Sequence, residues 1–536
     1  ETYFDTKYSL KKQPTSLYVQ DERFEAMSVV IKRVGREPHF FGGPKRVAEA
    51  FDRLRPYQDQ IIMCCHHSQF DGYIASHHFD FHPKFHICTL SMSRPLHGTE
   101  MPLDLGTLAQ HYGAPQLKTE MPDVKGKRWR DLSLDERRAL ALYNRNDVEA
   151  TEYIARQMIP QLPKTELQII DLTVRMFTEG MLRINVEEAQ KVFDDEREVK
   201  QEACKLAGVE PEKLASNPKF AALLEERGYE VPTKWSLKQE KFVPAFAQSD
   251  LPFQKMRDSD DEELAALIDA RLKVKSTLNE TRAQHMLDRA NHPVPIYLNY
   301  SRAHTMRWSG GDKFNAQNLP RDGRLRRCLE APDGHMLVVP DAAQIEARVN
   351  GAFAGQQDLL DEFKRYDAVG KGNGVPSPYR KMAATIYRCT PEEVTDEQRF
   401  VGKVATLGCG YQMGAAKFQL TLEQGMMGPP MIISFEEAQM AINAYRAKNY
   451  KIKQTWTELQ ARLPFLLPTS QRAEEFRGLV FDPKGSVRMP NGLEMHYPRI
   501  GYETGQYGTA EFYYWPYDAR FKKQIKNKLY GGLLLE

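Results

Sequence analysis

The pattern of apolar residues changes character twice along the chain, and these changes divide it into parts. Up to about residue 155, short apolar runs typical of strands alternate with amphipathic helical stretches. From about 164 to 290 the pattern is almost entirely helical, and beyond 335 helical and strand-like pieces are mixed again. With 536 residues, the chain is also longer than the roughly 250–300 residues that one hydrophobic core supports. The sequence therefore predicts several domains, beginning with an α/β unit followed by a helical one.

The composition excludes several classes of protein. Apolar residues make up 41% and charged residues 27%, which is typical of a folded globular chain and not of a disordered one. No apolar run approaches the ~18 residues that a membrane-spanning helix needs, so we expect no membrane partner. The seven cysteines are scattered and form no CxxC pair, which argues against a disulfide framework or a zinc site and favours the cytoplasm. The net charge of +2 means that a nucleic acid would bind to local basic patches.

Three helix starts are marked by capping boxes, in which a Ser or Thr is followed three residues later by Glu or Gln. Ser133 and Glu136 predict the start of a long amphipathic helix that continues to about residue 158. In the later part of the chain, Thr390 with Glu393 and Thr395 with Gln398 each predict a further helix start.

Three short segments in the first part carry residues suited to metal-dependent hydrolysis of phosphodiesters. They are Glu1-Thr2, residues 66–71 (HHSQFD) and residues 143–147 (YNRND). This chemistry uses carboxylates that converge on two divalent ions. Asp71 follows an apolar strand-like run. Tyr143 and Asp147 lie four residues apart on a predicted helix and so share a face. Taken singly, each of these residues is more often a helix cap or a solvated side chain.

Taken together, the three segments resemble the DEDD-type 3′–5′ exonuclease, whose motifs are DxET, HNxxFD and YxxxD. The resemblance covers about 150 residues and implies an RNase H-like α/β domain. It implies that Glu1, Asp71 and Asp147 bind metal and that Tyr143 orients the attacking water. The first Asp of the motif is expected two residues before Glu1.

Two segments in the middle of the chain suit nucleic acid and metal. Residues 305–321 (TMRWSGGDKFNAQNLPR) combine guanidinium and amide side chains with glycines, which suits a nucleic-acid backbone and groove edge. A predicted strand, His335–Val339, is followed by Asp341 and Ala342, and an Asp at a strand end can chelate Mg²⁺ together with the next carbonyl. Seen alone, the first segment is more often an Arg-rich surface loop and the Asp a helix cap.

A stripe of four residues marks the predicted helix that begins after Thr395. Arg399, Lys403, Leu407 and Tyr411 recur every four residues, and each such step turns only ~40° around a helix, so the four share one slanting face. An Arg and a Lys one turn apart can hold a triphosphate. A solvated basic face is the alternative, but it does not explain why Leu and Tyr continue the stripe.

These segments resemble the motifs of family A DNA polymerases. Residues 341–348 are similar to motif A (DxSQIExR), 399–414 to motif B (RxxxKxxxFGxxYG), 305–321 to the primer–template motif (TGRxS…NLQNxP) and 488–498 to the PSGRxLxYP element. Other stretches, such as TELQIIDLTVRMFTEG, are typical of the phage branch. The family implies a right-hand fold, with an exonuclease domain at 1–155, thumb and linking helices at 156–300, the first part of the palm at 301–370, fingers at 371–480 and more of the palm at 481–536.

The resemblance also implies an activity and a set of functional residues. The activity is template-directed nucleotidyl transfer with two Mg²⁺ ions per active site, for which Mn²⁺ is a substitute. Asp341 would bind both ions with the carbonyl of Ala342, and Glu346 would exclude the ribose 2′-hydroxyl. The implied dNTP-binding residues are Gln344, Glu346, Arg399, Lys403, Leu407 and Tyr411, and the implied primer–template residues are Thr305, Arg307, Asn315, Gln317 and Asn318.

Motif C of the family, a His-Asp-Glu turn with the second catalytic Asp, is expected some tens of residues after the YGG at 530–532. The palm is therefore expected to be incomplete in this sequence, with a continuation or a second chain supplying the turn. We interpret the sequence as a phage-type replicative DNA polymerase with a proofreading exonuclease, acting in the bacterial host cytoplasm on primer–template DNA and dNTPs with phage accessory proteins. Two alternatives stay open: an exonuclease whose polymerase body only binds DNA, and a fragment active only with a complementary chain.

Overall fold

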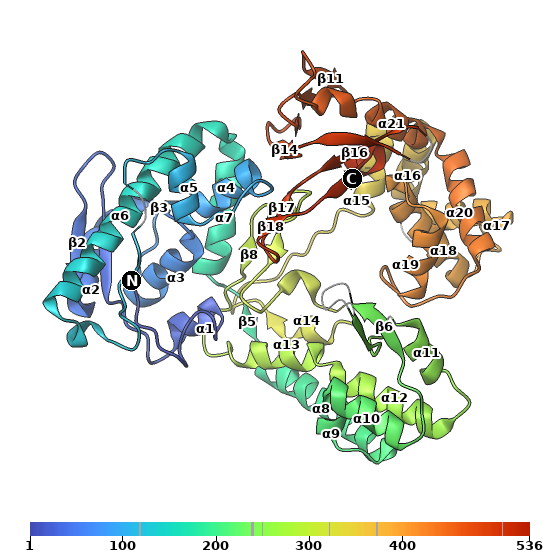
Figure 1. Cartoon of the computed structure of the whole chain (residues 1–536), viewed down its shortest axis with the longest axis horizontal. Coiled ribbons are helices and arrows are strands. Elements are labelled where there is room, and N and C mark those ends of the chain that lie inside the picture. The colour runs from blue at the N-terminus through green and yellow to red at the C-terminus, as the bar shows by residue number, and fades with distance from the viewer. Residues whose placement is uncertain (117–118, 237–240, 249, 321, 371–373, 506–507) are drawn as a thin grey trace.

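The computed structural model describes residues 1–536 except 117–118, 237–240, 249, 321, 371–373 and 506–507. Arg321, the last residue of the predicted primer–template motif, thus lies outside the described residues. Figure 1 shows three lobes: an N-terminal lobe in blue to teal, a helical lobe in green and a C-terminal lobe in orange to red. In the part of the chain that is described, no helix has the length and apolar character needed to cross a membrane.

The N-terminal lobe combines two pairs of strands with helices. Strands β1 (Ser28–Ile31) and β2 (His39–Gly42) pair antiparallel, whereas β3 (Ile62–Cys65) and β4 (Phe85–Cys88) pair parallel. Within the described residues the two pairs are not joined into one sheet, and the RNase H-like fold stays a prediction. The α-helices of this lobe are α1 (Thr15–Gln20), α2 (Pro44–Leu54), α3 (Ser68–Phe79), α4 (Thr89–His97), α5 (Leu105–His111) and α6 (Leu134–Met158).

Helix α6 packs against β1, β2 and β3 and so spans both strand pairs. It begins at the predicted capping box: the Ser133 hydroxyl accepts a hydrogen bond from Glu136 N (3.2 Å), and the Glu136 carboxylate accepts one from Ser133 N (2.8 Å). Its buried face includes Leu140, Ile154 and Met158. The sequence prediction of this helix is confirmed.

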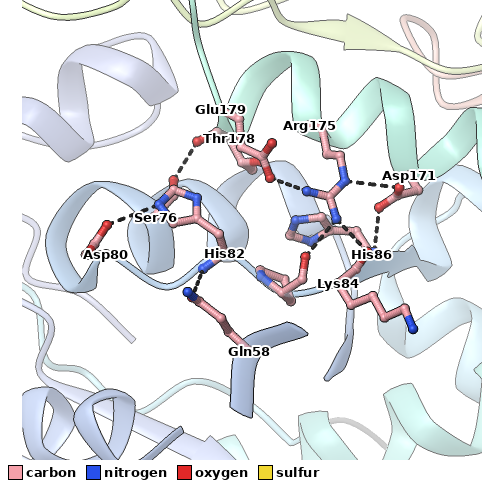
Figure 2. Close-up of polar contacts among 11 residues, drawn as sticks. Gln58, Ser76, Asp80, His82, Lys84, His86, Asp171, Arg175, Thr178 and Glu179 are labelled. Carbon is pink, nitrogen blue, oxygen red and sulfur yellow. Dashed lines mark hydrogen bonds and ion pairs between the residues drawn. The ribbon is translucent and has the colours of Figure 1, made fainter. Parts of the chain in front are cut away.

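Helix α7 (Lys164–Thr178) connects the N-terminal lobe to the rest of the chain, and Arg175 ties it to β4. The Arg175 guanidinium donates to the carbonyls of Pro83 (2.7 Å) and Lys84 (2.6 Å) just before β4, and it pairs with Asp171 and Glu179 on its own helix. Figure 2 shows these contacts converging on Arg175. Since His86 N also donates to Asp171 (2.6 Å), α7 is fixed to the edge of β4 at several points.

The helical lobe has its own apolar core, which includes Phe220, Phe253 and Leu267. Residues 261–290, which carry one continuous helical pattern, fold as two helices that meet at Ser276 and Thr277, residue types that bond to nearby backbone and disfavour helix interiors. The elements are α8 (Val186–Ala207), α9 (Pro211–Ala215), α10 (Asn217–Glu226), β6 (Thr233–Ser236), β7 (Lys241–Pro244), α11 (Leu251–Arg257), α12 (Glu262–Lys275) and α13 (Leu278–Leu287).

Short strands and one short helix connect the lobes. Strand β5 (Arg183–Ile184) pairs with β10 (Leu329–Glu330), and β8 (Leu298–Asn299) pairs with β9 (Ser309–Gly310), both antiparallel. Helix α14 spans Arg324–Arg327.

The C-terminal lobe packs helices on two antiparallel sheets. Its helices are α15 (Ile345–Ala354), α16 (Gln357–Val369), α17 (Pro378–Tyr387), α18 (Asp396–Gly408), α19 (Ala415–Glu423), α20 (Phe435–Lys448), α21 (Tyr450–Gln460) and α22 (Gly531–Leu535). One sheet has the order β11 (Glu474–Phe476), β12 (Leu479–Asp482), β13 (Ser486–Arg488), β14 (Glu494–His496). The other has the order β15 (Gly501–Thr504), β16 (Ala510–Tyr514), β19 (Asn527–Leu529), with β17 (Tyr517–Asp518) and β18 (Lys523–Gln524) as a separate pair.

The predicted strand His335–Val339 is not formed, which corrects the sequence prediction. Residues 335–340 have no strand pairing, and Met336, Val338 and Val339 are 82%, 77% and 86% exposed. A strand is stable only when its backbone groups bond to a neighbouring strand, and within the described residues no strand lies beside this segment. The apolar pattern alone therefore did not produce a strand here.

Candidate functional site

The four residues of the stripe lie on the accessible face of α18 and the short 3-10 helix that continues it, Cys409–Tyr411. Arg399, Lys403, Leu407 and Tyr411 are each half-buried. The residues between them face the core, including Val401, Gly402, Val404, Ala405, Thr406 and Gly408. The predicted geometry of the stripe is confirmed, while the roles of its members stay predictions.

Helix α18 is held close to α17, and Gly402 makes this approach possible. A Cβ at Gly402 would lie 2.3 Å from the carbonyl oxygen of Tyr379 and 2.7 Å from Ala383 N, which no side chain allows. The start of α18 is fixed by the predicted capping box, in which the Thr395 hydroxyl accepts from Gln398 N (3.2 Å). The stripe is therefore presented on a helix whose position and start are both constrained.

Two of the polymerase-like motifs are joined by an ion pair whose charges act on a residue of a third. Arg307 of the primer–template motif donates from its guanidinium to the carboxylate of Glu346 on α15 (2.9 Å). Burial and the charge of Glu346 together raise the pKa of Tyr411 to about 12, against the lowering effect of the charge of Arg307. The electrostatic environment of Tyr411 thus includes both members of the ion pair.

Arg348, to which the sequence argument gave no role, fixes the turn that follows Asp341. Its guanidinium donates to the Ala343 carbonyl (2.9 Å) and to the Gln344 side chain (3.2 Å), and it forms a bidentate pair with Asp367 on α16 (2.6 and 2.8 Å). The turn needs this support because Gln344 has a left-handed backbone (φ 59°). The signal was present in the sequence, since Arg is the last residue of motif A.

Asp341 and Ala342 are exposed and lie in the irregular segment before α15. Two divalent ions need several carboxylates to offset their charge. Glu346, the next carboxylate along the chain, is engaged with Arg307. Among the described residues, no group of three or more His, Cys, Asp or Glu side chains is arranged to hold a metal ion. The residues around Asp341 therefore do not fit a two-metal site as they are arranged here.

The predicted primer–template residues lie on and after the β8–β9 hairpin. Arg307, Gln317 and Asn318 are exposed, and Thr305 is half-buried. The Asn315 side chain accepts from Gln317 N (3.1 Å) and so caps the 3-10 helix Ala316–Asn318. The structure brings these residues together on one loop, and their contacts with DNA stay predictions.

The three predicted metal ligands of the exonuclease come from different elements, and the charges of Glu1 and Asp147 both act on Asp71. Asp71 lies in the first turn of α3, Asp147 lies on α6, and the Glu1 carbonyl accepts from Met27 N (2.9 Å) at the start of β1. Burial and the charges of Glu1 and Asp147 together raise the pKa of Asp71 to about 7, against the lowering effect of the N-terminal amine. Mutually repelling carboxylates are a donor set that suits a divalent cation, although the described residues are not already arranged around a common point.

Tyr143, predicted to orient the attacking water, is buried, with 6% of its surface exposed. It lies on the same helix as Asp147, one turn earlier, as the spacing predicts. Its catalytic role stays a prediction.

Comparison with known proteins identifies the family. The model of DNA polymerase family A matches residues 184–463, which is over half of the chain. The chain therefore belongs to DNA polymerase family A. It is 30% identical to DNA polymerase I of Aquifex aeolicus over 142 residues, which cover 26% of this chain and 22% of that protein. It is also 30% identical to DNA polymerase I of Pseudomonas aeruginosa over 182 residues, which cover 33% of this chain and 18% of that protein.

The matched regions thus span about a fifth of the length of these curated relatives. Among solved structures, the fold is similar to the polymerase domain of Pol1 from M. smegmatis, determined in complex with DNA primer-template and dNTP. The TM-score is 0.56 and the identity 17%, over 89% of this chain and 76% of that chain. This likeness confirms the polymerase fold of the chain.

Proposed function

We propose that this chain is a template-directed DNA polymerase of the phage type that also carries a 3′–5′ proofreading exonuclease. The observation that carries the polymerase assignment is the contact between Arg307 and Glu346, which come from two polymerase motifs, with the charges of both acting on Tyr411 of a third motif. Family membership supports it independently. Its substrates would be primer–template DNA and dNTPs, and it would act in the cytoplasm of a bacterial host with phage accessory proteins.

The chain's own residues would bind and select the incoming nucleotide. Arg399 and Lys403 lie one turn apart on the accessible face of α18, where two cations can hold a triphosphate. Leu407 would pack on the sugar, and Tyr411 would stack near the templating base. Glu346, held by Arg307, would occupy the space that a ribose 2′-hydroxyl needs and so favour deoxynucleotides.

The exonuclease site would be formed by Glu1, Asp71 and Asp147 with Tyr143. Divalent ions, when bound to such carboxylates, activate water and stabilise the leaving oxygen of a phosphodiester. The raised pKa of Asp71 supports this proposal, because burial and then the charges of Glu1 and Asp147 disfavour its ionised form, which a bound cation would favour.

The test is a comparison of extension and excision by two variants of the natural protein. Lys403→Ala should abolish extension of a matched primer with dNTPs and Mg²⁺ while leaving 3′-end digestion intact. Asp147→Ala should do the reverse, with Asp135→Ala, an exposed carboxylate on the same helix (91%), as the matched control. Extension by Lys403→Ala at the unmodified rate would remove the polymerase assignment.

A second candidate function is a 3′–5′ exonuclease whose polymerase body only binds DNA. The observation that favours it is a contrast in burial and charge: Asp71 is under the charges of Glu1 and Asp147, whereas Asp341 is exposed and the next carboxylate, Glu346, is paired with Arg307. Under this reading, the 536-residue chain digests 3′ ends but does not extend a primer, even with excess dNTPs and Mn²⁺.

A further inference from the structure

The carboxylate of Asp312, inside the primer–template motif, caps a helix of the N-terminal lobe. Ser16 N donates to its two oxygens (3.4 and 3.3 Å), and the Ser16 hydroxyl also donates to it, across 296 residues of sequence. Helix α1 needs such a partner, because its own N-cap residue, Pro14, has no side-chain acceptor. The acceptor that this helix lacks is therefore supplied by a loop of the polymerase part.

The same carboxylate is bound from the opposite side by Arg289, which follows α13. The guanidinium donates to the Asp312 carbonyl (2.8 Å) and to its carboxylate (3.3 Å), and the two side chains are 0% and 2% exposed. A buried charge is tolerated only when it is paired, so neither partner can be lost without leaving an unpaired charge. Asp312 thus joins Ser16 of the N-terminal lobe to Arg289 at the end of α13.

The loop around Asp312 is held in an unusual conformation. Asp312 and Lys313 both have left-handed backbones (φ 56° and 55°), and such residues persist only where surrounding contacts determine them. Lys313 Nζ donates to the Lys12 carbonyl (2.9 Å), a second tie to the N-terminal lobe. Gly311 lies against Tyr297, where a Cβ would be 2.3 Å from the ring.

On its other side, α1 is bonded to the chain that carries Glu1. The Tyr18 hydroxyl donates to the Tyr3 carbonyl (2.5 Å) and is hydrogen-bonded to the Thr2 hydroxyl (2.7 Å). One short helix therefore connects the predicted exonuclease ligand Glu1 to the primer–template loop through Ser16 and Asp312.

A second connection runs from the start of α3. His67 Nε2 is hydrogen-bonded to the Tyr297 hydroxyl (2.5 Å), and Gln69 donates to the Leu298 carbonyl (3.0 Å). Asp71 follows in the first turn of the same helix. The start of α3, which carries Asp71, is thus bonded directly to Tyr297 and Leu298 at β8. The segment that carries Glu1 is linked to Asp312 through α1.

We propose that Asp312 is a positioning residue: it fixes the place of the primer–template loop, residues 305–318, relative to the exonuclease carboxylates. It does not touch the DNA; it fixes the loop that would. The proposal rests on the proposed function, in which this loop holds the primer, and it extends that function to the division of a primer end between extension and excision. Loosening this link should change how often a primer end is extended and how often it is digested.

The test uses the full chain and its Ser16→Ala, Asp312→Asn and double variants, followed by hydrogen exchange. Ser93→Ala is the matched control, since Ser93 is also fully buried but its hydroxyl donates to Leu90 within its own helix. Ser16→Ala should increase amide hydrogen exchange in residues 305–318, although the substitution itself lies outside this segment. Ser16→Ala removes the hydroxyl donor of this link and Asp312→Asn removes the charge of its acceptor, so the losses of denaturant resistance in the two single variants should not add up in the double variant.

The functional readout compares two substrates. Ser16→Ala should weaken binding of primer–template about three- to tenfold, the range expected for one hydrogen bond. Digestion of single-stranded DNA, which needs no primer–template loop, should stay unchanged, so the ratio of excision to extension should rise.

Unchanged exchange in residues 305–318 would overturn the proposal, as would a parallel fall in both activities that follows the loss of stability. Complete inactivity of the unmodified protein on both substrates would instead refute the proposed function, and the exchange and denaturation measurements would still decide the link.

Discussion

The hydroxyl of Tyr300 donates a hydrogen bond of 2.5 Å to the carboxylate of Glu166, and this bond joins the start of α7 to the segment that follows β8. Both residues are buried, with 4% and 8% of their surfaces exposed. The second oxygen of Glu166 accepts from the Asn491 side chain (3.3 Å), within the segment similar to the PSGRxLxYP element. One buried carboxylate therefore links α7 to two segments of the polymerase part.

Tyr300→Phe should lower the free energy of unfolding by about 1–3 kcal/mol, because it leaves a buried carboxylate oxygen without its donor. Urea denaturation at unchanged slope measures this loss. Tyr502→Phe, at a position that is 60% exposed, is the matched control and should change stability by less than about 0.5 kcal/mol. A loss no larger than that of the control would show that Glu166 does not depend on this bond.

The raised pKa of Asp71 predicts a response to pH and to divalent cations. Burial and the charges of Glu1 and Asp147 raise this pKa from its ordinary value to about 7. Since the folded-state pKa exceeds the unfolded one, the contribution of Asp71 to stability is present at low pH and is lost as the pH rises through about 7. Mg²⁺ should therefore raise the melting temperature more at about pH 8 than at about pH 5.5.

Asp71→Asn supplies the control for that experiment, because an amide has no proton to lose in this range. In this variant the Mg²⁺-induced shift should be small and the same at both pH values. An equal Mg²⁺ shift at both pH values in the unmodified protein would contradict the assignment of Asp71 as a cation ligand.

Leu407 predicts a particular preference among nucleotides. A Leu side chain lacks the flat face of an aromatic ring, so its packing on the incoming sugar should be looser than that of Phe or Tyr. We expect slower but more discriminating incorporation than in Leu407→Phe or Leu407→Tyr, with a difference of roughly 1–2 kcal/mol. Single-turnover rates with dideoxy and ordinary nucleotides measure it, and identical ratios in all three proteins would refute the idea.

The affinity for primer–template should depend steeply on salt. Arg307, Lys522, Lys523, Lys526 and Lys528 are all exposed. Arg307 is paired with Glu346, Lys526 with Glu503 and Lys528 with Glu511. Each cation that meets a phosphate should contribute about −0.9 to the slope of log affinity against log salt.

Lys522→Ala should accordingly make the salt slope shallower by about one contact. The control is Lys364→Ala, a residue on α16 that is 75% exposed and near Asp361. A binding constant that is insensitive to salt would contradict the predicted contacts.

Local signals in the sequence predicted local structure well. The capping boxes at Ser133 and Thr395 mark observed helix starts, because the bonds that form them lie within four residues. The box at Thr390 is wrong as a helix start: Thr390 N donates to the Glu393 carboxylate (2.8 Å), but residues 391–393 form only a turn. The stripe from Arg399 to Tyr411 lies on one accessible face, since helical periodicity depends on spacing alone.

Features that depend on distant partners were not predictable in the same way. The apolar run at 335–339 reads as a strand, but strand formation needs a neighbour that the run itself does not specify. The bond between Ser16 and Asp312 joins residues 296 apart, and neither residue carries a signal of the other. The electrostatic influence of Glu1 and Asp147 on Asp71 also joins distant residues, and only the family motifs, not a local pattern, suggested it.

The exposed, unpaired segment from Met336 to Val339 has a consequence for the behaviour of the protein in solution. A segment that pairs with no strand of its own molecule and exposes apolar side chains can pair with a strand of another molecule. Aggregation, measured as light scattered per unit of protein, should therefore increase with protein concentration. Val338→Lys should reduce this aggregation, because it places a charge in the exposed apolar segment. The segment that the sequence predicts as a strand is therefore expected to limit the colloidal stability of the protein.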